Sequence, residues 1–279
     1  MNFYSESLKL HHNTFVLLRD LIQERTGLFF EENKMDILAD KLSPLVIERG
    51  FGSFLDYYYL LKYDGDAAEE WGKVVDVLTV QETFFWREVD QIRTVADVIV
   101  PRHFEAFPEK PFQIWSVPCA TGEEPLSIAM ALDQKGCFGR YPIRILGADI
   151  SPSAIGKAHR GLYRERAFRN LPAALKERYF TREGDLWRVD ETLQSRIQWG
   201  LLNLLDEASP LIPDQVPVIF CRNVFIYFTP PTIRRVVKMF YERMPVPGYL
   251  FVAASESLLK LTTDFELQEI GGAFVYVKK

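Results

Sequence analysis

The chain has 279 residues, of which 48% are apolar and 25% charged, a composition typical of a globular protein with one large domain or two smaller ones. Its formal net charge of −5, without a basic stripe, makes nucleic acid a poor candidate for its partner. Three widely spaced cysteines argue against a disulfide framework or zinc site, and the lack of a long apolar run or leader pattern argues against a membrane span or secretion, so we expect a cytoplasmic protein without a metal.

The first part of the chain has a helical pattern throughout. Apolar residues recur at helical spacing over residues 14–79, beginning with Phe15, Leu18 and Ile22. Ser53 follows a glycine and suits the N-cap of one helix. Residues 1–75 hold 8 Lys and Arg against 13 Asp and Glu, which accounts for the whole net charge. The pattern predicts a helical N-terminal domain of about four helices over residues 1–79.

After a connector expected over residues 80–110, strands and helices alternate. Buried strands are predicted at residues 112–117, 143–150, 197–205 and 217–228. Helices are expected to begin near Pro125, after the N-cap Ser151, and at Pro230, and a hairpin is expected around Gly271 and Gly272. This order predicts an α/β doubly wound sheet over residues 111–279, with a mostly parallel core and antiparallel edge strands.

Residues 163–196 do not follow the alternation of strands and helices that the rest of this domain shows. Residues 163–196 contain a short helical pattern and a hairpin-like segment, YFTREGDLWRV. We therefore expect a small inserted subdomain here.

Polar residues gather where the predicted strands end. These positions are Cys119 to Glu124, Asp149, residues 202–204 and residues 221–227. In an open α/β sheet the ligand lies beyond the carboxyl ends of the central strands, so these ends are expected to form one pocket.

The turn after the first strand has the layout of a phosphate-binding loop but the opposite charge. Gly122 allows a tight turn and a close backbone approach, yet neither G-x-G-x-x-G nor a P-loop is present. Glu123 and Glu124 would repel a phosphate and favour a cationic ligand; the alternative, which we adopt for one of the two, is that the glutamate only complements the helix dipole. Asp149 suits a ribose contact, or an Asx turn. A cationic nucleoside without phosphate describes S-adenosylmethionine.

The segment TVQETFFWRE, residues 79–88, offers a second group of polar side chains. Gln81 and Thr83 are hydrogen-bonding residues, and Arg87 is a bidentate carboxylate binder. Phe84 and Phe85 are interpreted as core residues.

A third group lies in FCRNVFIYF, residues 220–228. Arg222 and Asn223 interrupt a buried run, and a buried arginine needs a partner. That partner is the cofactor or the substrate, or alternatively a structural salt bridge. Tyr227 is either a site residue or part of the core.

The motifs ETFFWRE, CATGEEPLSIAMAL, ADISPSAIGKA, NLLD, FCRNVFIYF and SESL occur in order along the chain. With them the sequence resembles the CheR-type chemotaxis receptor methyltransferases over nearly its whole length. The resemblance implies a helical N-terminal domain, a Rossmann-like methyltransferase domain with an inserted antiparallel β subdomain, and methylation of chemoreceptor glutamate side chains with S-adenosylmethionine.

The resemblance also implies site residues, and of the two glutamates it selects Glu124, which leaves Glu123 as the complement of the helix start. The expected cofactor-binding residues are Gln81, Thr83, Arg87, Gly122, Glu124, Asp149, Asn203, Leu204, Arg222 and Asn223. The expected catalytic residues are Arg87, which would position the incoming carboxylate, and Tyr227, which would line the methyl-transfer site. A glutamate carboxylate is already ionised at neutral pH, so no general base is expected.

The partner implied is the cytoplasmic domain of a chemoreceptor. The turn in YFTREGDLWRV is short, with one glycine, and we expect no tethering of a receptor's C-terminal peptide there. Two alternatives remain: methylation of a receptor in a non-chemotaxis signalling array, and a non-catalytic sensor that binds S-adenosylmethionine or S-adenosylhomocysteine.

Overall fold

The computed structural model describes residues 8–65 and 67–279. The chain divides into two compact units. One comprises Met1–Val80 and Tyr227–Thr232, and the other comprises Gln81–Ile226 and Ile233–Lys279. None of the helices in the described part of the chain is long and apolar enough to cross a membrane.

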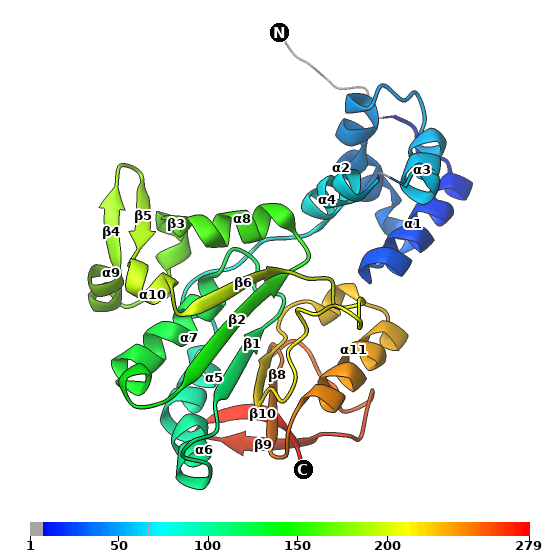
Figure 1. Ribbon diagram of the computed structural model, residues 1–279. Helices are drawn as coiled ribbons and strands as arrows, with labels where there is room; N and C mark the ends of the chain where they lie inside the picture. The colour runs from blue at the N-terminus through cyan, green and yellow to red at the C-terminus, as the bar shows by residue number, and fades with distance from the viewer. Residues whose placement is uncertain (1–7, 66) are drawn as a thin grey trace. The chain divides into compact units, whose positions relative to one another are not determined.

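The first unit is helical, as the sequence predicts. Its helices are α1 (His12–Thr26), α2 (Met35–Glu48), α3 (Phe54–Tyr63) and α4 (Ala68–Leu78), with a 3-10 turn at Glu32–Lys34 before α2 (Figure 1). Ser53 caps α3 as predicted, because its hydroxyl oxygen accepts a hydrogen bond from the backbone N–H of Asp56.

A buried carboxylate fastens three helices of this unit together. Glu70 of α4 is almost fully buried and accepts hydrogen bonds from the Tyr57 hydroxyl of α3 and the guanidinium of Arg49, which follows α2. Because an unpaired buried carboxylate is costly, these two bonds hold the helices in register.

The second unit is built on a seven-stranded sheet with the order β6-β2-β1-β7-β8-β10-β9. The strands are β1 (Phe112–Ser116), β2 (Ile143–Asp149), β6 (Ile197–Leu201), β7 (Val218–Phe220), β8 (Gly248–Phe251), β9 (Glu266–Ile270) and β10 (Ala273–Lys278). The strands β6, β2, β1, β7 and β8 pair in parallel, in this spatial order. β10 pairs antiparallel with β8 on one side and with β9 on the other. The predicted parallel core with an antiparallel edge is confirmed.

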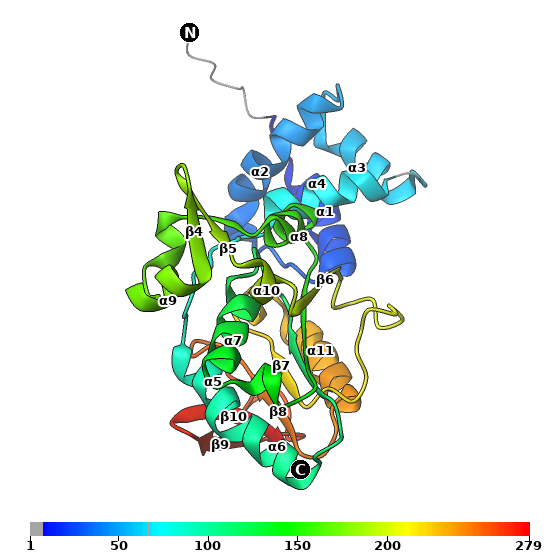
Figure 2. The same cartoon turned by 60° about the vertical axis from the view of Figure 1, so that its left-hand side comes forward.

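Helices cover both faces of this sheet. Ile114 of β1 belongs to the core shared with α7 (Glu123–Gln134), whereas its neighbour Trp115 packs against Phe240 of α11 (Pro230–Arg243), with ring centroids 5.6 Å apart. Successive strand residues point to opposite faces. The views of Figures 1 and 2 agree in showing α7 and α11 on opposite sides of the sheet.

Residues 162–194 add a second, small sheet. Strands β3 (Leu162–Arg164), β5 (Leu186–Val189) and β4 (Phe180–Glu183) pair antiparallel in that order, with α9 (Ala173–Tyr179) and α10 (Glu191–Gln194) beside them. The insertion follows α8 (Pro152–Arg160), which Ser151 caps as predicted. The expected inserted antiparallel subdomain is present.

The structure differs from the sequence interpretation in two places. Residues 81–106 are more than a connector: α5 (Val89–Thr94), a π-helical turn (Val95–Ile99) and α6 (Val100–Ala106) lie in the second unit and bury Ile92 and Val95 in its core. The strands expected over 197–205 and 217–228 are shorter. β7 ends at Phe220, and Asn223 has φ +60°, a conformation that no strand can continue through.

Candidate functional site

The loops after β1 and β2 are joined through Asp149. Its Oδ2 accepts a hydrogen bond from the backbone N–H of Ala120 (2.8 Å), and its Oδ1 accepts one from that of Ser151 (2.9 Å). The second bond is the Asx turn that the sequence offered as an alternative. Asp149 therefore orders the ends of two neighbouring strands, and its contact with a ribose stays a prediction.

Gly122 has two reasons to be glycine. Its φ of +96° is unfavourable for other residues, and a Cβ there would lie 2.8 Å from Trp199 Cη2 of β6. A tryptophan ring of the protein itself therefore packs closely against this glycine, and contact of Gly122 with the cofactor stays a prediction. Trp199 was not among the predicted site residues, because only the pairing of β6 with β2 brings it over the turn.

Glu123 begins α7, as the expected electrostatic complement of the helix start. Its side chain is only 5% exposed and accepts a hydrogen bond from the Thr121 hydroxyl (2.6 Å). Burial raises the pKa of Glu123 to about 6. The carboxyl group is therefore a buried group that titrates just below neutral pH.

Glu124 is paired with a buried arginine. Arg222 Nη1 donates to Glu124 Oε2 (2.8 Å), and the Ser116 hydroxyl donates to Glu124 Oε1 (2.7 Å). Arg222 Nη2 lies 3.1 Å from Glu88 Oε2 and donates to the backbone carbonyl of Arg87. Burial raises the pKa of Glu124, while Arg222 opposes that shift.

The structure thus shows the salt-bridge alternative for Arg222. One donor is left over: Arg222 Nε is buried and has no hydrogen-bond acceptor among the described residues. A buried guanidinium N–H without a partner is costly, and this atom is enclosed by the protein itself. Direct contact of Arg222 with the cofactor stays a prediction.

The segment from Gln81 to Arg87 lies along the second unit. The Gln81 amide donates to the hydroxyls of Ser151 (2.9 Å) and Ser153 (3.2 Å), next to the turn that follows β2. The partly buried Thr83 lies between Gln81 and the aromatic residues. Phe85 is fully buried in the core, as interpreted from the sequence.

The interpretation of Phe84 as a core residue is wrong. Its partly exposed ring lies beneath two guanidinium groups, with Cζ of Arg169 3.7 Å and Cζ of Arg87 5.5 Å from the ring centroid. Arg87 Nη1 also donates to the backbone carbonyl of Glu82 (3.3 Å). Among the residues that the structure describes, no carboxylate forms an ion pair with Arg87. Its charge is therefore available to an anionic ligand, in contrast to that of Arg222.

The ends of β6 and β7 carry the remaining predicted residues of this unit. Asn203 Oδ1 accepts a hydrogen bond from the backbone N–H of Leu205, and Leu204 between them is buried. Asn223 follows Arg222, and its backbone N–H donates to Glu256 Oε2 (2.9 Å).

Glu256 is a positioning residue that the sequence did not single out. Besides the bond from Asn223, its carboxylate accepts backbone N–H bonds from Phe225 (2.8 Å) and Ala253 (3.0 Å). It therefore fixes the loop after β7 to the loop after β8. The sequence feature that could have indicated this role is the place of Glu256 in the motif SESL, in the loop that follows the last parallel strand.

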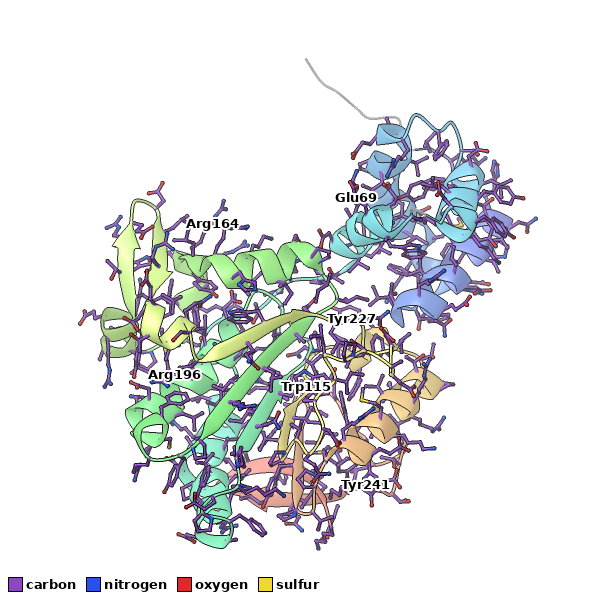
Figure 3. All side chains as sticks on the ribbon, viewed as in Figure 1. Glu69, Trp115, Arg164, Arg196, Tyr227 and Tyr241 are labelled. Carbon is purple, nitrogen blue, oxygen red and sulfur yellow. The ribbon has the colours of Figure 1, made fainter. Side chains whose placement is uncertain are left out.

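Tyr227 belongs to the other compact unit. It packs against the core of the helical unit, and its carbonyl accepts a hydrogen bond from the backbone N–H of Phe29 (2.9 Å), next to a bridge between Leu28 and Phe228. Its expected role beside the methyl group stays a prediction. Figure 3 labels Tyr227.

Comparisons with known proteins match both units. A family model described as "CheR methyltransferase, all-alpha domain" matches residues 13–79, and one described as "CheR methyltransferase, SAM binding domain" matches residues 81–273. The chain is 31% identical to Chemotaxis protein methyltransferase 2 of Vibrio cholerae (95% of this chain, 92% of that one). It is 32% identical to the Chemotaxis protein methyltransferase of Escherichia coli K12 (95% and 91%). It is 30% identical to the Probable biofilm formation methyltransferase WspC of Pseudomonas putida (92% and 60%).

Proposed function

Since the chain belongs to the CheR methyltransferase family and has its S-adenosylmethionine-binding domain, we propose that it methylates glutamate side chains of a bacterial chemoreceptor, forming glutamate methyl esters. The relatives named as chemotaxis protein methyltransferases support this substrate class. The enzyme would act in the cytoplasm, where its three buried, free cysteines would stay reduced.

The residues at the strand ends suit this cofactor. Three carboxylates, those of Glu123, Glu124 and Asp149, lie on or next to the turn after β1. Arg222 compensates the charge of Glu124, and the other two disfavour a phosphate and favour a cationic nucleoside. Arg222 lies beside this turn, paired with Glu124, and its contact with the amino-acid moiety of the cofactor is the role that the family resemblance implies for it. Asp149, Asn203 and Gly122 would hold the nucleoside, with Gln81 supporting the turn after β2.

For this reaction the chain has to position the substrate carboxylate, and it does not have to transfer a proton. Bound S-adenosylmethionine supplies an electrophilic methyl group on a positively charged sulfur. A substrate glutamate is ionised at neutral pH, so its oxygen can attack without a general base. The chain must hold that carboxylate in line with the methyl group and exclude water.

Arg87 is the residue proposed to hold the substrate carboxylate. The observation that supports this is the contrast between two arginines: Arg222 is bound by Glu124 and Glu88, whereas Arg87 has no carboxylate partner among the described residues and rests on Phe84. A guanidinium can bind a carboxylate through two parallel N–H bonds, which fixes its orientation as well as its distance.

The inserted sheet is proposed not to tether a receptor's C-terminal peptide. Only Gly184 and Asp185 separate β4 from β5, and Arg188 and Glu183 form an ion pair across the hairpin. Deleting the last residues of the receptor would then leave the methylation rate unchanged; a strong loss of rate would contradict this.

The proposal is tested with the full chain, tritiated S-adenosylmethionine and membranes that carry the chemoreceptors of the source organism. Methyl esters release labelled methanol in mild base, so base-labile label on receptor glutamates is expected. Base-stable label would identify an N- or S-methyl product and contradict the proposal. Tight binding of the cofactor without any methyl transfer would favour the alternative that the protein is a non-catalytic sensor of S-adenosylmethionine or S-adenosylhomocysteine.

A second candidate is methylation of a receptor in a signalling array that does not serve motility. The similarity to the probable biofilm formation methyltransferase of Pseudomonas putida favours it. Comparing label on receptors from strains that lack one array or the other separates the two candidates.

A further inference from the structure

A hollow of about 340 Å³ lies at the start of the outer parallel strands of the second unit. It is lined by Ile143, Arg144, Ile145, Ser195, Arg196 and Gln198. β2 runs from this hollow, at Ile143, to the predicted ribose contact at Asp149, so the hollow is at the opposite end of the strand from the methyltransferase site. Figure 3 labels Arg196 near the beginning of β6. The hollow is therefore separate from the site described above.

Two arginines, Arg144 and Arg196, line this hollow. β2 and β6 are parallel with Ile145 paired to Ile197, so Arg144 and Arg196 directly precede a paired position on adjacent strands. Neighbouring strands are about 5 Å apart, and like charges at facing positions repel. The fold thus brings two positively charged residues to one hollow.

Neither charge is neutralised by an acidic side chain of the described residues. Among the described residues, no carboxylate forms an ion pair with Arg144 or Arg196, although many other arginines of this unit are paired with acidic side chains. Arg196 is also held in place, because its Cζ lies 4.7 Å from the ring centroid of Phe138. A fixed guanidinium loses less entropy on binding than a mobile one.

The chemistry of the lining selects the ligand. Guanidinium groups match phosphate oxygens in a bidentate manner, the Gln198 amide adds a donor, and Ile143 offers an apolar surface beside them. The hollow is partly open to solvent, so these polar side chains rather than enclosure would hold a ligand there. We propose that this hollow binds a small molecule that carries a phosphate or diphosphate group. This goes beyond the methyltransferase function, and its test does not depend on that function.

The test is calorimetric titration of the full chain with pyrophosphate as the probe, at low salt. We expect saturable binding to the wild type and a loss of roughly tenfold or more in affinity for Arg144→Gln/Arg196→Gln, because two charge-assisted contacts are removed. The matched control is Arg164→Gln, an exposed arginine at the end of β3, which should bind pyrophosphate like the wild type. Unchanged affinity for S-adenosylhomocysteine would show that the double variant is folded.

Three outcomes would overturn the proposal. The first is no saturable binding of pyrophosphate to the wild type. The second is an equal affinity of the wild type and the double variant for pyrophosphate, which would show that the probe binds elsewhere. Competition between pyrophosphate and S-adenosylhomocysteine would have the same meaning. The third is sedimentation with phosphatidylglycerol vesicles that needs both arginines while pyrophosphate does not bind, which would assign the pair to a lipid surface.

Discussion

Arg222 Nη1 donates a hydrogen bond of 2.8 Å to Glu124 Oε2, and this buried pair joins the loop after β7 to the first turn of α7. The side chain of Arg222 is 3% exposed and that of Glu124 is 14% exposed. Removing the Glu124 carboxylate would leave the buried charge of Arg222 with Glu88 as its remaining acidic partner among the described residues.

We therefore expect Glu124→Gln to lower the free energy of unfolding of the second unit by about 3 kcal/mol. Urea denaturation followed by tryptophan fluorescence measures this change. The matched control is Glu207→Gln, since Glu207 forms an exposed ion pair with Arg235 and its loss should cost less than about 1 kcal/mol. Equal costs for the two variants would contradict a structural role for the buried pair.

Glu123 should make stability depend on pH. Its pKa is raised by burial to about 6, above the value of 4.5 that it has when unfolded, so the folded chain binds the extra proton. The stability contributed by Glu123 is fully present below pH 4.5 and is lost as the pH rises through about 6, a change of about 2 kcal/mol.

Glu123→Gln should remove this contribution and flatten the pH profile of stability between pH 4.5 and 7. Denaturation curves of the wild type and the variant across that range measure it. Parallel profiles for the two proteins would show that Glu123 is not the titrating group.

Gly122→Ala should be more harmful than an ordinary substitution at a glycine with positive φ. The alanine would be strained by φ +96° and its Cβ would collide with Trp199, so we expect a loss of about 2 kcal/mol or more. Gly184→Ala is the control, because φ is +60° there and nothing lies within 4 Å of the new Cβ. A thermal melt that shows equal losses would rule out the packing of Trp199 as a cause.

Asp149→Ala should weaken the binding of S-adenosylhomocysteine by roughly ten- to a hundredfold, since it removes a charged acceptor and the two N–H bonds that order the turns. The control is Asp190→Ala, which removes a carboxylate that caps α10 and should change only stability. Calorimetric titration of both variants compares them. Similar affinities for the two would contradict the role of Asp149.

The features that local sequence determines were predictable. Ser53 and Ser151 cap their helices through bonds to residues three positions later, and a serine after a loop and before an apolar run indicates such a cap. The alternation of strands and helices also predicted that Asp149 lies at a strand end beside the glycine turn.

The contacts that depend on tertiary packing were not predictable. Arg222 and Glu124 are 98 residues apart, and the sequence left the partner of Arg222 open. Glu256 fixes three backbone N–H groups in loops that only the sheet brings together. Phe84 and Phe85 are adjacent apolar residues, so the sequence does not show which of them is buried and which is covered by a guanidinium group. Both were therefore interpreted as core residues, and for Phe84 this is wrong.

The central claim is that Arg87 holds the substrate carboxylate during methyl transfer. The most direct measurement is the rate of base-labile methylation of receptor membranes by Arg87→Ala, together with the affinity of the variant for S-adenosylhomocysteine. The matched control is Arg234→Ala, because Arg234 is an exposed arginine whose hydrogen bond within the described residues, like that of Arg87, goes to a backbone carbonyl. We expect the rate for Arg87→Ala to fall about a hundredfold or more with its cofactor affinity nearly unchanged, and Arg234→Ala to match the wild type. Methylation by Arg87→Ala at the wild-type rate, with cofactor binding intact, would contradict the claim.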